Sequence, residues 1–133
     1  MILLDSHALL WWQAGGARLS AGARRAIDAA SVLLVSPVSF WEIAVLVRKG
    51  RIRLESDPHV WTQDLLASDR LQTASLSAVA AVTAGTLATP GFPGDPADAL
   101  IYATAIDLAV PLVTKDERLR IYARERRDVR TIW

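Results

Sequence analysis

The chain has 133 residues, 52% of them hydrophobic, and a formal net charge of +1 at pH 7. This length fits one domain, and so high an apolar share favours buried parallel strands and a self-association face. The absence of cysteine excludes a disulfide scaffold and thiolate metal sites. Because the N-terminus lacks a basic flank and no apolar stretch approaches membrane-spanning length, we expect a cytoplasmic protein with no membrane partner.

The apolar run that ends at Leu4 predicts a buried strand, and Asp5 follows it at the turn into a helix. Open α/β sheets bind their ligands beyond the carboxyl ends of the strands. Asp5 is therefore either a helix-start residue or the first ligand of an acidic site. Acids further along the chain decide between the two.

Later segments alternate between apolar runs and helical patterns. Further strands are predicted at 32–35, 71–74, 110–114 and 129–133. Helices are predicted at 8–12, 19–30, 38–48, 57–66, 75–87, 97–108 and 117–124, with a loop at 89–94. The helix at 38–48 is apolar nearly all round, so we expect it to be deeply packed. Strands that alternate with helices predict one α/β domain over residues 1–133, whose parallel sheet is covered on both faces.

Glu42 is the acid that is hardest to explain by local structure, because the segment around it is apolar. An ionised carboxylate there would lose solvation worth several kcal/mol unless something pairs it. Ser39 and Glu42 have the spacing of a capping box, which would be a structural role. Since Ser36-Pro37 is the better helix start, Glu42 falls in the second turn, where no free amide awaits it. We therefore favour a functional acid.

Asp95 and Asp98 lie at the start of a predicted helix, next to Pro96. An acid before a proline is a preferred cap, and an acid in the first turn gains from the helix dipole. Both roles can hold at once, with Asp95 capping the helix and Asp98 facing a cleft.

Asp116 follows the strand predicted at 110–114, so it lies at a carboxyl end as Asp5 does. As a purely structural residue it would cap the next helix. Like charges that gather at one sheet edge raise one another's pKa, so such a cluster persists where a cation neutralises it. Oxygen ligands without cysteine select Mg²⁺ or Mn²⁺, and the matching chemistry is phosphodiester cleavage by a metal-activated water.

Other conspicuous residues favour ordinary structural roles. His7 and His59 each begin a helix, and both are interpreted as local polar residues. Apolar helical faces carry Trp11, Trp41 and Trp61. These tryptophans are interpreted as core or dimer contacts in preference to RNA-stacking residues. The basic run at 48–53 is most simply a solvated face, and contact with phosphate is the sharper alternative. No phosphate-binding glycine loop or serine-hydrolase motif is present.

Four motifs in this order resemble the PIN domain, and most closely the VapC toxins of bacterial toxin–antitoxin pairs. The motifs are Leu3-Leu4-Asp5-Ser6-His7, Val38-Ser39-Phe40-Trp41-Glu42-Ile43-Ala44, Asp95-Pro96-Ala97-Asp98 and Leu112-Val113-Thr114-Lys115-Asp116. The resemblance covers the chain from end to end. It implies a three-layer α/β/α fold with a parallel sheet of strand order 3-2-1-4-5.

The resemblance also implies an endoribonuclease that depends on Mg²⁺ or Mn²⁺, forms a homodimer and is held inactive by a small VapB-type antitoxin. Carried over by position, the catalytic and metal-binding acids would be Asp5, Glu42, Asp98 and Asp116. Asp5 and Asp98 would be the main metal ligands, and the other two would bind directly or through water. Ser6, Asp95 and Thr114 would be auxiliary residues.

Two positions depart from the pattern of many relatives around the third acid. Pro93 stands where a histidine is common, and Ala99 stands where an arginine is common. The acids themselves are retained, so we expect metal binding to be retained too. By the same resemblance, the missing arginine would remove one contact to phosphate or antitoxin.

Two alternatives compete with the ribonuclease. A receiver-like phosphotransfer domain would need paired acids after the first strand and an Asp after the third, and neither is present. A non-catalytic binding or dimerisation module would keep the acids as helix caps. Metal titration distinguishes this binding module from the ribonuclease, because a helix cap needs no ion and the module would not be stabilised by Mn²⁺.

Overall fold

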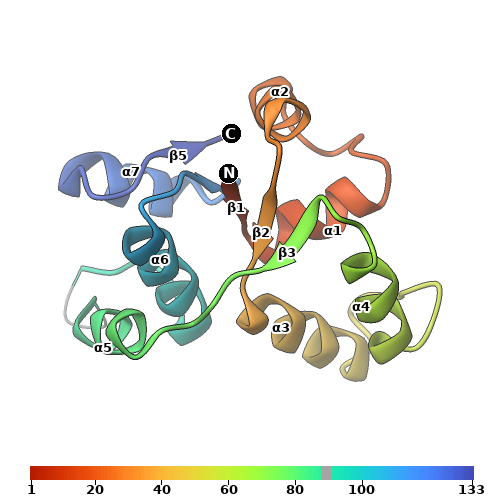
Figure 1. The fold of residues 1–133 in the computed structure, drawn as a ribbon. Helices are drawn as coiled ribbons and strands as arrows, with labels where there is room; N and C mark the ends of the chain where they lie inside the picture. Colours follow the sequence, from red (N-terminus) through yellow and green to blue (C-terminus); the bar gives the residue numbers. More distant parts are fainter. Residues whose placement is uncertain (88–90) are drawn as a thin grey trace.

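A parallel sheet of short strands forms the centre of the computed structural model, which describes residues 1–87 and 91–133 (Figure 1). The strands are β1 (Ile2–Leu4), β2 (Leu33–Val35), β3 (Leu71–Thr73), β4 (Leu112–Val113) and β5 (Thr131–Ile132). Their order in the sheet is β3-β2-β1-β4-β5, and each pairs in parallel with its neighbour. This is the strand order expected from the resemblance, and it is confirmed.

Helices connect the strands and cover both faces of the sheet (Figure 1). They are α1 (Ser6–Gln13), α2 (Ala21–Ala29), α3 (Pro37–Arg48), α4 (Pro58–Leu66), α5 (Ala78–Leu87), α6 (Pro96–Leu108) and α7 (Glu117–Arg126). Each follows its predicted range to within three residues. Of the loop predicted at 89–94, residues 89 and 90 lie outside the described residues. None of the described helices is long and apolar enough to cross a membrane.

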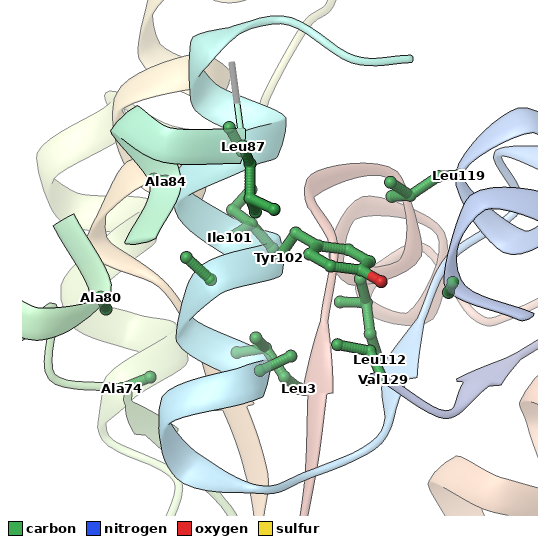
Figure 2. Packing of buried hydrophobic residues seen from close by; sticks show 14 of the residues in the cluster. Leu3, Ala74, Ala80, Ala84, Leu87, Ile101, Tyr102, Leu112, Leu119 and Val129 are labelled. Atoms are coloured by element: carbon green, nitrogen blue, oxygen red, sulfur yellow. The ribbon is translucent and has the colours of Figure 1, made fainter. Parts of the chain in front are cut away.

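The strands divide the core into two clusters because successive side chains of a strand point to opposite faces. Leu3 and Leu112 pack with residues of α5, α6 and α7 (Figure 2). Leu4 and Val113 pack with residues of α1, α2, α3 and α4. The three-layer α/β/α arrangement follows directly from this alternation.

Serine and aspartate side chains set the helix starts, as the sequence predicts. Ser20 caps α2 by accepting from the amide of Ala23 at 3.0 Å. Ser36 caps α3 by accepting from the amide of Val38 at 3.2 Å, with proline in the first helical position. An N-cap oxygen satisfies an amide that the helix leaves unpaired.

Deep packing of α3 is the one prediction about an element that is wrong. Only Ser39 and Ile43 of this helix are buried, and Trp41 is 63% exposed. The reason is that α3 packs against α1, α4 and α6 on one side. The face that carries Trp41, Ala44 and Arg48 is left uncovered. Trp41 is therefore not a core residue, whereas Trp61, at 5% exposure, is one.

Candidate acidic active site

A cleft of about 420 Å³ opens at the carboxyl ends of β1 and β4. All seven residues predicted for the site line it, namely Asp5, Ser6, Glu42, Asp95, Asp98, Thr114 and Asp116. Ile101, Leu112 and Leu119 add apolar walls. Parallel strands end at one edge of a sheet, so residues distant in sequence meet there.

Asp5 and Thr114 are neighbours because they follow paired residues, Leu4 of β1 and Val113 of β4. Asp5 Oδ1 accepts from the amide of Ala8 at 2.7 Å and so caps α1. Burial raises the pKa of the Asp5 carboxyl, and hydrogen bonds from Thr114 and Ala8 oppose that rise. Burial makes the charged form costly, and a nearby cation would lower that cost.

Glu42 is held by Ser6, whose Oγ donates to Glu42 Oε1 at 2.6 Å. Since Ser36 caps α3, Glu42 lies in the second turn, and the capping-box reading with Ser39 is wrong. Burial raises the pKa of the Glu42 carboxyl, the bond from Ser6 opposes the rise, and the negative charge of Asp95 adds to it. Glu42 thus points into the cleft as a partly buried acid with one oxygen hydrogen-bonded to Ser6.

Asp95 and Asp98 form a reciprocal capping box at the start of α6. Asp95 Oδ1 accepts from the amide of Asp98 at 2.9 Å, and Asp98 Oδ2 accepts from the amide of Asp95 at 3.0 Å. Both predicted roles therefore hold at once, because Asp98 also lines the cleft. Gly94 makes this approach possible, since a Cβ there would lie 2.6 Å from Asp98 Cβ.

Asp116 caps α7, because its Oδ1 accepts from the amide of Leu119 at 3.2 Å. Its own amide donates to Thr114 Oγ1 at 3.2 Å. Thr114 is fully buried between two acids, Asp5 and Asp116, and contacts both. The threonine therefore fixes the spacing of the acids that end β1 and begin α7.

Glu42, Asp95 and Asp98 form a close group of acids, in which one carboxylate oxygen from each residue lies within 4.8 Å of the other two. The pKa of Asp98 is raised to about 7, chiefly by burial and further by the negative charges of Asp95 and Glu42. An all-oxygen donor set with uncompensated negative charge fits a hard divalent cation. Asp5 and Asp116 line the same cleft outside this group.

The resemblance predicts Asp95 as an auxiliary residue, and its place beside Glu42 and Asp98 follows from the capping box. That motif presses two carboxyl groups together at one helix start. The assignment of Asp5, Glu42, Asp98 and Asp116 as metal ligands stays a prediction.

Three further charged or polar residues line the cleft, His7, Lys115 and Glu117. Sequence reasoning set His7 aside as a local polar residue and gave Lys115 no role. The signal that could have found Lys115 is its position between Thr114 and Asp116, two residues at the end of a strand. Gly94 gave no signal, since only its close contact with Asp98 reveals its role.

Comparison with known proteins finds a matching family model and a relative that is similar over nearly the whole chain. The family model of the PIN domain matches residues 2–125. Ribonuclease VapC22 of Mycobacterium tuberculosis is 45% identical over 134 residues, which cover 99% of this chain and 98% of that protein.

Among solved structures, similar chains occur in VapBC-1 from nontypeable Haemophilus influenzae, with a TM-score of 0.70 and 17% identity over 98% of this chain and 96% of that one. VapBC2 from Rickettsia felis, bound to a promoter DNA fragment, gives a TM-score of 0.67 and 17% identity over 98% and 97%. At this identity the likeness supports the fold alone.

Proposed function

The chain belongs to the PIN domain family, and from this premise we propose that it is a VapC-type endoribonuclease, the toxin of a toxin–antitoxin pair. It cleaves RNA phosphodiester bonds in the cytoplasm. The observation that carries the proposal is the cleft, in which acids from three helix starts and from the second turn of α3 gather at one sheet edge. The 45% identity to a ribonuclease along nearly the whole of both chains supports the reaction class.

The proposed cofactor is Mg²⁺ or Mn²⁺, bound by Asp5, Glu42, Asp98 and Asp116, with Asp95 close enough to contribute. A bound divalent cation would lower the pKa of a coordinated water and offset charge that grows on phosphate oxygens. The raised pKa values of Asp5, Glu42 and Asp98 support this assignment, because burial and mutual repulsion are the strains that a cation relieves.

The protein's own residues fix the geometry of the acids. Each helix-capping bond occupies one carboxylate oxygen and orients the other, as at Asp5 and Asp116. Ser6 does the same for Glu42 through its hydroxyl. Because the acids are already held in place, they need little rearrangement as the transition state forms. Such positioning is the main contribution of the protein to phosphoryl chemistry of this kind.

The proposed partner is a VapB-type antitoxin, and an apolar groove beside the cleft supports this proposal. The groove has a volume of about 360 Å³ and is lined by Val38, Trp41, Pro96, Ala97 and Leu100. Asp95 lines both the groove and the cleft. An apolar partner segment seated against Trp41 could therefore extend a tail into the acidic site.

We further propose a homodimer. The apolar excess of the chain supports it, as do two valines of α5, Val79 and Val82, which are 67% and 69% exposed. They are three residues apart and share one helix face. The molecular mass in solution from light scattering tests this, and a Val79→Glu, Val82→Glu variant should be monomeric.

The test of the ribonuclease is cleavage of a mixed RNA pool by purified protein with Mn²⁺, with Mg²⁺ and with chelator. We expect cleavage with metal only. Absence of cleavage together with absence of a thermal shift on adding Mn²⁺ would leave the second candidate function, a non-catalytic binding module. One observation favours that candidate, namely that Asp5, Asp95 and Asp116 are each used as caps.

A further inference from the structure

Trp11 of α1 lines a second hollow of about 600 Å³ and contacts two residues of the acidic cleft, His7 and Lys115. The ring lines the second hollow, together with Arg18 and Arg53. It also contacts Lys115, which lines the acidic cleft. One tryptophan thus contacts a cation from each of the two hollows.

Two cations are placed over this one ring. Lys115 Nζ lies 4.7 Å from the ring centroid, and Arg18 Cζ lies 5.0 Å from it. His7, which lines the acidic cleft, meets the same ring edge-on at 5.7 Å. A cation over an aromatic face is attracted to it, so the ring holds both flexible side chains near one another.

Neither cation forms an ion pair in the described part of the chain. Within residues 1–87 and 91–133, the ion pairs join His59 to Asp57 and Arg126 to Asp128. Lys115 and Arg18 are exposed and take part in neither pair. Both cationic groups can therefore be reached by an anion from solution.

Position favours a phosphate chain as that anion. The acids of the cleft repel phosphate groups, so a strand that enters the cleft needs positive charge close beside it. Lys115 supplies that charge inside the cleft, and the next hollow has two cations, Arg18 and Arg53, against one acid, Glu55. Positive grooves that follow the backbone are how proteins bind single strands without reading their sequence.

We propose that Lys115 and Arg18, which Trp11 positions, form with Arg53 of the second hollow a track that binds the phosphates of single-stranded RNA flanking the scissile bond. This inference rests on the proposed ribonuclease function and adds the path of its substrate. Trp11 is a positioning residue in this proposal, because the cations already occupy its ring. Trp11 also packs against the core cluster of α1–α4, so the sequence-based interpretation as a core contact holds beside this role.

The experiment measures binding of a labelled single-stranded oligoribonucleotide by fluorescence anisotropy at several salt concentrations, in the Asp98→Asn background with chelator so that no cleavage occurs. We expect Lys115→Ala and Arg18→Ala each to weaken binding and to reduce the slope of log affinity against log salt by about 0.7 per lost phosphate contact. Trp11→Leu should weaken binding, and Trp11→Phe, which keeps an aromatic face, should restore most of it.

Arg124→Ala is the matched control, because Arg124 is an exposed cation in the last turn of α7 and lines neither hollow. Its affinity and salt slope should equal those of the background protein. Lys115→Ala and Arg18→Ala change exposed side chains, so both proteins should fold, and circular dichroism checks this.

Unchanged affinity and salt slope in Lys115→Ala and Arg18→Ala would overturn the track. Equal losses in Arg124→Ala would also overturn it, since they would show attraction to net charge alone. Weaker binding of an acidic partner protein with RNA binding intact would assign the surface to that partner instead. Failure of the ribonuclease itself is distinguishable, because the wild-type protein would then cut no RNA with metal.

Discussion

Asp98 is the residue at which charge repulsion and local structure meet. It is partly buried, its pKa is raised to about 7, and its Oδ2 also accepts the amide of Asp95. Asparagine keeps an oxygen acceptor for that bond and removes the charge. The Asp98→Asn change therefore separates the role in the cleft from the role as a cap.

We expect Asp98→Asn to abolish metal-dependent cleavage and to leave the melting temperature without metal equal or higher, since like-charge repulsion is relieved. Cleavage assays and thermal unfolding in chelator measure the two effects. A lower melting temperature with cleavage intact would show that Asp98 is only a cap.

Gly94 predicts a second single-residue effect. A Cβ at this position would lie 2.6 Å from Asp98 Cβ and 2.9 Å from the ring of Phe92. Gly94→Ala should therefore destabilise the protein by about 1–3 kcal/mol, as overpacking does. It should also lower cleavage, because Asp98 has to shift. Urea unfolding and the cleavage rate measure the two losses.

Gly85→Ala is the control for that change. Gly85 lies in α5 with no atom within 4 Å of an added Cβ. Alanine there should stabilise the helix by about 0.5–1 kcal/mol without altering cleavage. If both variants lost the same stability, the cause would be a general intolerance of added side chains and not the specific contact between residue 94 and Asp98.

Helix starts are the elements that build the site. The first turns of α1, α6 and α7 open into the cleft, and each is capped by an acid that lines it. Partial positive charge at a helix N-terminus favours carboxylates there. Capping and metal binding are thus compatible uses of the same acids, because a carboxylate has two oxygens.

The bond from Ser6 to Glu42 ties α1 to α3 across the cleft. Ser6→Ala should raise the pKa of Glu42 further, because the hydroxyl stabilises the charged form. The acidic limb of the activity profile should therefore move to higher pH. The lost bond should also cost about 1–3 kcal/mol, since it leaves a partly buried carboxylate oxygen unpaired. Activity against pH and urea unfolding test the two parts.

Ser77→Ala is the matched control. Ser77 Oγ donates to Asp107 Oδ2 at 2.8 Å and accepts from the amide of Ala80, away from the cleft. Its loss should lower stability and leave the pH profile unchanged. If the activity profile shifted with pH in both Ser6→Ala and Ser77→Ala, the shift would result from lost stability and not from the pKa of Glu42.

The order of elements and the gathering of acids could be predicted from the sequence, since strand ends and helix caps are local signals. Asp5 and Asp116 meet because β1 and β4 are neighbours, which the resemblance implied and periodicity alone did not. The exposure of Trp41 could not be predicted, because an apolar helix face does not reveal which side its neighbours leave open. The meeting of Lys115 and Arg18 over Trp11 depends on side-chain placement across three separate segments.

At the scale of the whole molecule, the buried acids couple folding to pH. Asp5, Glu42 and Asp98 all have raised pKa values in the folded protein. Between the ordinary pKa of 3.8 and about 7, Asp98 keeps its proton when folded and loses it when unfolded. The folded state then binds more protons than the unfolded state, so stability falls as pH rises through this window.

Through Asp98, the metal-free protein should therefore have a melting temperature that decreases from about pH 4 to about pH 7. Mn²⁺ competes with protons for the same oxygens, so its stabilising effect should grow over the same range. Thermal unfolding at pH 5, 6, 7 and 8, in chelator and in Mn²⁺, measures both trends.

In Asp98→Asn the decrease of the melting temperature with pH should be smaller, and so should the stabilisation by Mn²⁺. A Mn²⁺ effect that is largest at pH 5 would contradict an acidic metal site, because the ligands would then bind metal while they still hold their protons.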